Sequence, residues 1–223
     1  MTMPETTLTH LDGYCERAGM PGLWAEPVDV ISNIAFLIAA YLAWRKWGNA
    51  GGKDISLLIA LLAAIGVGSA IWHLAGSGVA VLFDVIPILL FMNVYLMSFL
   101  VRVAGCGWRG AVIGFLAFQM LNAASETFLP RGMLNGSVMY LPAYSVLALM
   151  TLYLFRTRHP AAKTLLGITL LWSLSIAFRT MDMTICPMFP LGTHFLWHIL
   201  NAVVLYKLIG LLAAAPQRAA PAG

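Results

Sequence analysis

Long apolar stretches separated by short polar segments follow one another along almost the whole chain. Seven of these stretches approach the roughly 20 mostly apolar residues that a membrane-spanning helix needs. They lie at residues 27–44, 55–74, 79–101, 111–128, 138–155, 164–180 and 191–213, and those at 111–128 and 164–180 are the least apolar. The pattern predicts an all-α integral membrane protein, with one seven-helix bundle over residues 1–213 and a disordered tail over residues 214–223.

The composition supports a bilayer as the solvent of this chain. Hydrophobic residues make up 61% of it and charged residues only 10%, whereas a soluble domain carries about 25% charged residues. A chain this apolar cannot cover itself with polar surface. The net charge of +4 is spread along the loops, with no basic stripe interleaved with aromatic residues, so we expect no nucleic-acid partner.

The basic residues between the stretches predict the orientation. Cytoplasmic loops carry the excess of Lys and Arg. One set of alternate loops and the tail holds most of them, and the other set holds only Arg17 and Arg131; the larger set is Arg45, Lys46, Lys53, Arg102, Arg109, Arg156, Arg158, Lys163 and Arg218. The N-terminus is therefore expected outside and the C-terminus in the cytoplasm. The short loops favour a bacterial inner membrane with the polar half facing the periplasm, and a eukaryotic endomembrane with a lumenal site is the alternative.

Several ionisable residues fall inside the apolar stretches, where each one is costly and suggests a function. With the orientation above, His73, Asp84, His194 and His198 all lie in the outer half of the membrane, and Glu126 and Asp182 end their helices on the same side. Structural polar residues would not be expected to gather in one leaflet. A proton-coupled transporter would spread its carboxylates across the membrane depth, so this clustering weighs against one.

Spacing of four residues puts His194 and His198 on one helix face, and Ser69 and His73 on another. Three imidazoles plus a water are the ligands of a catalytic zinc site. Asp84 could take a proton from that water or orient a histidine, and Ser69 could donate to an oxyanion. Each residue also has a simpler explanation: a hydrogen bond between helices for a histidine, a relay or buried partner for Asp84, and helix packing for Ser69.

The motifs GSAIWH at residues 68–73, FDVIP at 83–87 and HFLWH at 194–198 resemble those of the alkaline ceramidases. YCE at residues 14–16, EPVDVISN at 26–33, and Asp182 followed by Cys186 resemble that family too. The matches keep the family's order and cover most of the chain. The resemblance implies a seven-helix fold with the N-terminus outside or lumenal, in agreement with the loop charges.

The resemblance also implies an activity and a zinc site. Zn²⁺ would be held by His73, His194 and His198, with Asp84 and Ser69 as the catalytic pair beside it. The family hydrolyses the amide bond of ceramide to a sphingoid base and a fatty acid. The lipid would enter sideways from the outer leaflet. Asp84 would take the proton of the attacking water while Ser69 stabilises the oxyanion.

Two further family features map onto the N-terminal segment. A calcium site would draw on Asp12, Tyr14, Glu16 and Glu26, although Gly13 and Ala18 stand where the family has oxygen-bearing side chains; a solvated acidic loop is the alternative. A disulfide would join Cys15 to Cys186, with two free thiols as the alternative. Cys106 is expected on the inner side as a free thiol.

Three functions remain open at this point. The first is a zinc-dependent lipid amidase of ceramidase type. The second is a zinc hydrolase that acts on another N-acyl lipid or an ester. The third is a seven-helix lipid receptor with a structural zinc site, against which the short inner loops weigh mildly. Asp84 favours an enzyme, because a structural zinc site fills its fourth position with protein.

Overall fold

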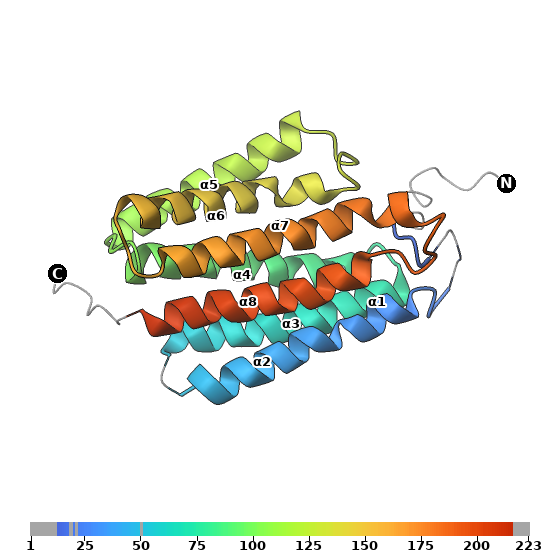
Figure 1. The fold of residues 1–223 in the computed structure, drawn as a ribbon, viewed down its shortest axis with the longest axis horizontal. Coiled ribbons are helices and arrows are strands. Elements are labelled where there is room, and N and C mark those ends of the chain that lie inside the picture. Colours follow the sequence, from blue (N-terminus) through green and yellow to red (C-terminus); the bar gives the residue numbers. More distant parts are fainter. Residues whose placement is uncertain (1–12, 18–19, 21, 50, 216–223) are drawn as a thin grey trace.

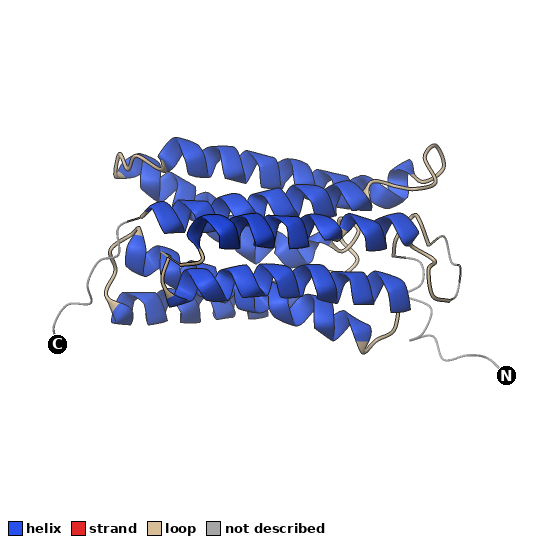
Figure 2. Cartoon of the chain, turned by 90° about the horizontal axis from the view of Figure 1, so that it is seen from below, coloured by secondary structure: helices blue, strands red, loops and turns tan. Residues whose placement is uncertain are grey.

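The computed structural model describes residues 13–17, 20, 22–49 and 51–215. Every described element is a helix, and Figure 2 shows these helices running side by side with the loops gathered at the two ends. In chain order the elements are α1 (Pro27–Ser32), α2 (Ile34–Trp47), α3 (Lys53–Ala75), α4 (Ala80–Arg102), α5 (Trp108–Phe128), η2 (Ser137–Tyr140), α6 (Leu141–Arg156), α7 (Ala162–Ile185) and α8 (His194–Ala214).

The helices form one bundle that matches the predicted all-α class. α1 and α2 follow each other in nearly one line, interrupted at Asn33, whose side-chain amide donates to the carbonyl of Asp29 (2.8 Å). α8 packs against α1, α2, α3, α4 and α7, so it lies at the centre of the bundle (Figure 1). Buried apolar side chains such as Phe36, Leu62 and Ile209 fill the space between these helices.

Within the described residues, six helical segments are long and apolar enough to cross a membrane. They are Pro27–Trp47, Lys53–Ala75, Ala80–Arg102, Ser137–Arg156, Ala162–Ile185 and His194–Ala214. The protein is therefore a multi-pass membrane protein. α5 is not among the six, although it packs against α4 and α6. Gln119, Asn122 and Glu126 make it more polar than the other long helices, so a seventh span stays a prediction.

Most helix boundaries lie within a few residues of the prediction. The largest difference is at α7, which continues to Ile185 instead of ending near residue 180. Asp182 therefore lies inside the helix, fully buried. Its carboxylate accepts hydrogen bonds from the backbone N–H groups of Cys15, Thr193 and His194 (2.6–2.9 Å). These bonds stabilise a buried charge that the sequence predicted at the end of the helix.

The two ends of the bundle differ. One end, called the site end below, holds the start of α1 and of α8 together with the N-terminal residues 13–17 (Figure 1). A disulfide joins Cys15 to Cys186 there, as the family resemblance implied, and the two Cα atoms are 5.4 Å apart. Cys106 is a free thiol in the α4–α5 connection at the opposite end. At that opposite end Arg102 pairs with Asp54 through both carboxylate oxygens.

α3 and α4 approach each other very closely near the site end. A Cβ atom added at Gly68 would overlap the backbone carbonyl of Phe83. Only glycine permits this contact, because it has no Cβ atom. Gly68 precedes Ser69 and Phe83 precedes Asp84, so the close approach brings these two polar side chains together.

Candidate metal centre

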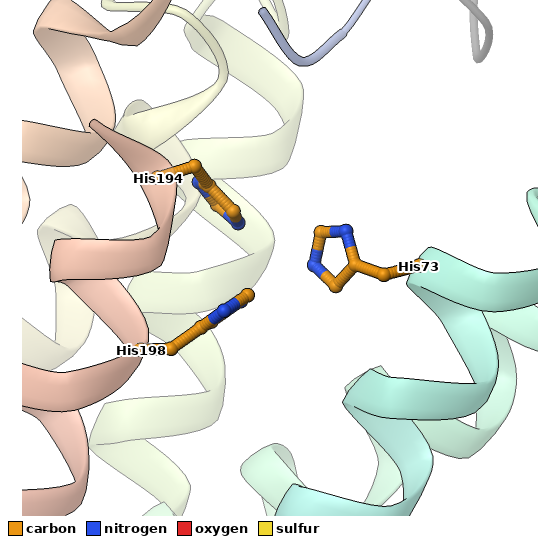
Figure 3. Close-up of side chains that lie close together, drawn as sticks. All are labelled: His73, His194 and His198. Carbon is orange, nitrogen blue, oxygen red and sulfur yellow. The ribbon is translucent and has the colours of Figure 1, made fainter. Parts of the chain in front are cut away.

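Three histidine rings converge at the site end. His73 comes from the last turn of α3, while His194 and His198 come from the first two turns of α8 and face it (Figure 3). The ring centroids are 5.1, 4.8 and 4.6 Å apart in the three pairs. One nitrogen of each ring lies within 4.8 Å of the others, and the three side chains are 1–3% exposed. The structure therefore brings together the three histidines predicted as metal ligands.

Two of the rings are oriented by hydrogen bonds on their outer side. Nδ1 of His73 bonds the carboxylate of Glu26, and Nδ1 of His198 bonds the hydroxyl of Ser32 at 2.7 Å. These bonds leave Nε2 of each ring as the nitrogen available to a metal. Partners of this kind fix the tautomer of a metal-binding imidazole, and a carboxylate also raises its basicity. Ser32 was not predicted, although it lies within the quoted motif at residues 26–33.

His194 differs from the other two rings. Its Nδ1 atom is buried and has no hydrogen-bond partner among the described residues. A buried polar atom without a partner is costly in a folded protein. The three converging imidazoles, each with one nitrogen within 4.8 Å of the others, are a ligand set that zinc accepts. The residues present therefore fit the metal that the resemblance implied.

The backbone of His194 is held by Asp182. Oδ1 of Asp182 accepts the N–H groups of Thr193 (2.6 Å) and His194 (2.9 Å), and Oδ2 accepts that of Cys15 (2.9 Å). These donors include the first N–H groups of α8, which have no acceptor within the helix. Asp182 thus fixes the start of α8, on which two of the three histidines lie, and ties it to the disulfide-linked segment.

Asp84 and Ser69 lie together beside the histidines. Ser69 follows Gly68 and Asp84 follows Phe83, so the close approach of α3 and α4 brings their side chains together. Oδ1 of Asp84 is buried with no partner in the described part of the chain. Both side chains line the same cavity as the three histidines. The structure therefore places the two predicted catalytic residues where a molecule bound at the histidines would meet them.

The cavity beside the three histidines has a volume of about 1100 Å³. Pockets for small ligands span about 300–1,000 Å³, so this one is slightly larger than that range. Its walls are mostly apolar away from the histidines, with Phe91, Leu147, Met150 and Leu208 among them. From His194 to Leu208 is 14 residues of α8, which is about 21 Å at the rise of an α-helix. The cavity is thus long, with its charged side chains and the three histidines at one end.

The motifs and this geometry agree with a comparison against protein families. The family model described as Ceramidase matches residues 14–218. The chain belongs to the ceramidase family. A search of curated proteins finds no match to this chain. The match covers most of the ceramidase-family chain, including the three histidines, Asp84 and the disulfide cysteines, so the resemblance found in the sequence is confirmed.

Glu26 of this ceramidase-family protein lies between a histidine and a buried arginine. Its carboxylate bonds Nδ1 of His73 and Nε of Arg17, and the two charged side chains are 2% and 1% exposed. Burial raises the pKa of Glu26, and the Arg17 guanidinium opposes this shift. Arg17 also donates to the carbonyl of His73 (3.1 Å) and lies against Gly76, at the C-terminal end of α3. A cation is stabilised there by the helix dipole.

The described residues predicted to bind calcium have contacts within the protein. Both oxygens of Glu16 accept N–H groups at the start of α1, from Val28 (2.7 Å) and Asp29 (2.8 Å). The carboxylate of Glu26 bonds His73 and Arg17. Tyr14 packs against the rings of His73 and His194, at 4.8 and 4.4 Å between centroids, and loss of solvation raises the pKa of its hydroxyl. Asp12 and Ala18 lie outside the described residues.

Among the described residues of the predicted calcium site, Glu16 bonds backbone N–H groups, and Glu26 bonds Arg17 and His73. Neither carboxylate is therefore left free to bind calcium. The positive charge beside Glu26 is supplied by Arg17 instead. The carboxylate of Asp29 is buried without a hydrogen-bond partner in the described part of the chain. Asp29, Glu26 and His73 form a second cluster of side chains whose ligand atoms lie within 4.8 Å of one another. No step of the chemistry below depends on calcium.

Arg179 is a residue of the cavity wall that the sequence reading missed. It lies on α7, within the predicted span at residues 164–180, and it lines the cavity beside Asp84 and the histidines. A basic residue inside an apolar stretch was a signal that could have found it, because such residues are rare and tend to be functional.

Proposed function

We propose that this ceramidase-family protein is a zinc-dependent membrane hydrolase that cleaves the amide bond of ceramide or a ceramide-like N-acyl lipid. The products would be a free fatty acid and a sphingoid base or related amine. The observation that carries the proposal is the convergence of three buried histidines at the polar end of a long apolar cavity. The amide of a lipid would then lie at the histidines with its acyl chain along the cavity.

His73, His194 and His198 would hold the metal, with Glu26 and Ser32 orienting two of the rings. Bound zinc supplies a Lewis acid for the amide carbonyl and makes a water molecule acidic enough to attack near neutral pH. Asp84 accepts a proton from the attacking water through Oδ1, which has no competing partner among the described residues. Asp84 then gives this proton to the leaving amine, so that water and amide become carboxylic acid and amine.

Ser69 has two tasks in this scheme. A hydrogen bond from its hydroxyl to Asp84 would hold the carboxylate toward the cavity, since the close approach of Gly68 to Phe83 brings the two side chains together. Rotation of the same hydroxyl toward the amide oxygen would let it donate to the negative charge that develops there. Removal of one donor to such an oxyanion costs about 10²–10³ in kcat.

Two alternatives keep the metal but change the function. A zinc hydrolase of a different acyl lipid would use the same residues, because nothing in the chemistry above requires a sphingoid base. A receptor would carry the metal only as a structural element. The partly buried Asp84 beside the histidines supports the enzyme, since an open position next to a general base is typical of a catalytic zinc site.

The orientation set by the loop charges would place the site in the outer leaflet, with lipid entering from the bilayer. For a bacterial inner membrane this is the periplasmic side, and for a eukaryotic endomembrane it is the lumenal side. Labelling of Lys46 in intact cells tests this, because Lys46 lies in the last turn of α2, at the end of the bundle opposite the histidines. Reaction of Lys46 with an impermeant outer reagent would invert the proposed topology.

The activity is tested with the purified protein in detergent. Fatty acid release from a panel of ceramides is measured with and without a strong zinc chelator, together with the metal content of the wild type and of His194→Ala. We expect about one zinc per chain, release that the chelator abolishes, and loss of both zinc and release in the variant. Bound zinc without release from any ceramide or other acyl lipid would contradict the hydrolase and favour the receptor.

A further inference from the structure

Arg179 is held in a fixed position by neutral groups. Its Nη1 donates to the carbonyl of Asn135 (2.7 Å) and the hydroxyl of Ser137 (3.2 Å). Its guanidinium lies 5.4 Å from the ring centroid of Tyr140 and 5.9 Å from that of Trp197. Aromatic faces attract a cation in this range. The guanidinium is therefore oriented before any ligand binds.

No carboxylate forms an ion pair with Arg179 in the part of the chain that the structure describes. Glu126, an acidic residue of the cavity wall on α5, is paired with Arg131 at 3.2 Å. Asp84 forms no ion pair with Arg179 among the described residues, and the two charges interact only over a longer distance. The neutral acceptors also take only part of the N–H groups that a guanidinium offers. Arg179 thus keeps both charge and donors for a ligand.

The position of Arg179 along the cavity identifies which part of a ligand it would meet. Its partners Asn135 and Ser137 belong to the segment before α6, and Trp197 lies between the two histidines of α8. The apolar wall residues Leu147 and Met150 follow two to three turns further along α6. An acyl chain fits that apolar half. Arg179 therefore lies at the headgroup end of the cavity, level with the metal centre.

We propose that Arg179 binds an anionic group, a carboxylate or a phosphate, on the amine side of the amide that is cleaved. The inference rests on the proposed function for the identity of the ligand as a substrate. Among the described wall residues, Glu126 is paired with Arg131, which leaves Asp84 as the one unpaired carboxylate near Arg179. With a divalent metal at the histidines, this end of the cavity would carry a net positive charge. The planar guanidinium matches both groups with two parallel N–H donors. The preferred substrate is then an acidic N-acyl lipid rather than neutral ceramide.

The first arm of the test measures hydrolysis of matched lipid pairs. Ceramide is compared with ceramide 1-phosphate, and N-palmitoylethanolamine with N-palmitoylglycine, which separates phosphate from carboxylate. We expect the wild type to prefer an acidic member. Arg179→Met should lower kcat/KM for that member by about 10- to 100-fold, mainly through KM, and change the neutral member little. Arg179→Lys should recover part of the loss. Arg156→Met, exposed at the opposite end, is the control and should match the wild type.

The second arm measures binding without catalysis. N-palmitoylglycine and N-palmitoylethanolamine are titrated into chelator-treated protein in a neutral detergent, and binding is followed by calorimetry. A preference for the acidic amphiphile that disappears in Arg179→Met supports the anion site even when no lipid is hydrolysed, and in that case only the proposed function fails. Equal binding and equal turnover of both members of each pair by the wild type would overturn the inference, whatever the stability of the variants.

Discussion

Glu26→Gln tests whether the carboxylate behind His73 tunes the metal centre. Glutamine keeps the size of the side chain but removes the negative charge that faces Nδ1 of His73 and the guanidinium of Arg17. Loss of such an outer partner costs about 10- to 100-fold in metal affinity, which equals about 1.4–2.8 kcal/mol. The change also leaves Arg17 buried without its counter-charge, at a cost to stability of about 3–5 kcal/mol.

The two effects separate in a paired assay. Zinc affinity is measured by competition with a chelator, and thermal unfolding is measured with and without zinc. The stability loss lowers the melting temperature both with and without zinc. The weaker zinc binding reduces the difference between the melting temperatures measured with and without zinc. We expect both changes in Glu26→Gln. Ser32→Ala removes only a neutral hydrogen bond from His198, so its zinc affinity should fall by at most about tenfold.

Asp54→Asn is the matched control, because it breaks an arginine–carboxylate pair, that of Arg102, at the other end of the bundle. It should lower the melting temperature and leave zinc affinity unchanged. If folded Glu26→Gln binds zinc as tightly as the wild type, the carboxylate does not tune His73, and Glu26 serves only to neutralise Arg17.

Three further outcomes are expected. Asp84→Asn should keep its zinc and lose about 10²–10⁴-fold in kcat; full turnover would leave Asp84 only an orienting role. Gly68→Ala should lower the melting temperature and kcat, at a cost of about 1–3 kcal/mol, because its Cβ would overlap the carbonyl of Phe83; Gly167→Ala, with nothing within 4 Å of its added Cβ, should not. A calcium-selective chelator should leave lipid hydrolysis unchanged, since Arg17 already supplies the charge beside Glu26, and stimulation by added calcium would contradict this.

The spacing of residues along the predicted helices indicated several candidate residues of the site. His194 and His198 are four residues apart, as are Ser69 and His73, and a helix places such pairs on one face whatever surrounds it. The apolar stretches likewise predicted the helices, because length and hydropathy are properties of each segment alone. The sixth stretch was predicted to end near residue 180, whereas α7 continues to Ile185, and Asp182 is stabilised inside it by backbone donors from Cys15 and Thr193.

The partners of the histidines could not be predicted in the same way. Glu26 reaches His73 across 47 residues of sequence, and Ser32 reaches His198 across 166. The motif that contains both residues was visible, but the resemblance assigned Glu26 to calcium. Only the packing of α1 against α3 and α8 decides which side chain faces which ring.

The sequence by itself determined the class of fold and the family, and it indicated the three histidines as candidate metal ligands. These inferences depend on segment composition, ordered motifs and helical spacing. The tertiary structure alone decided that Arg17 neutralises Glu26, that Asp182 holds the start of α8, and that Arg179 faces the cavity. Arg17 and Glu26 are only nine residues apart, and Asp182 and His194 only twelve, but neither pair lies within one helix. Their geometry depends on how close the helices come and how each is rotated, which the bundle sets as a whole.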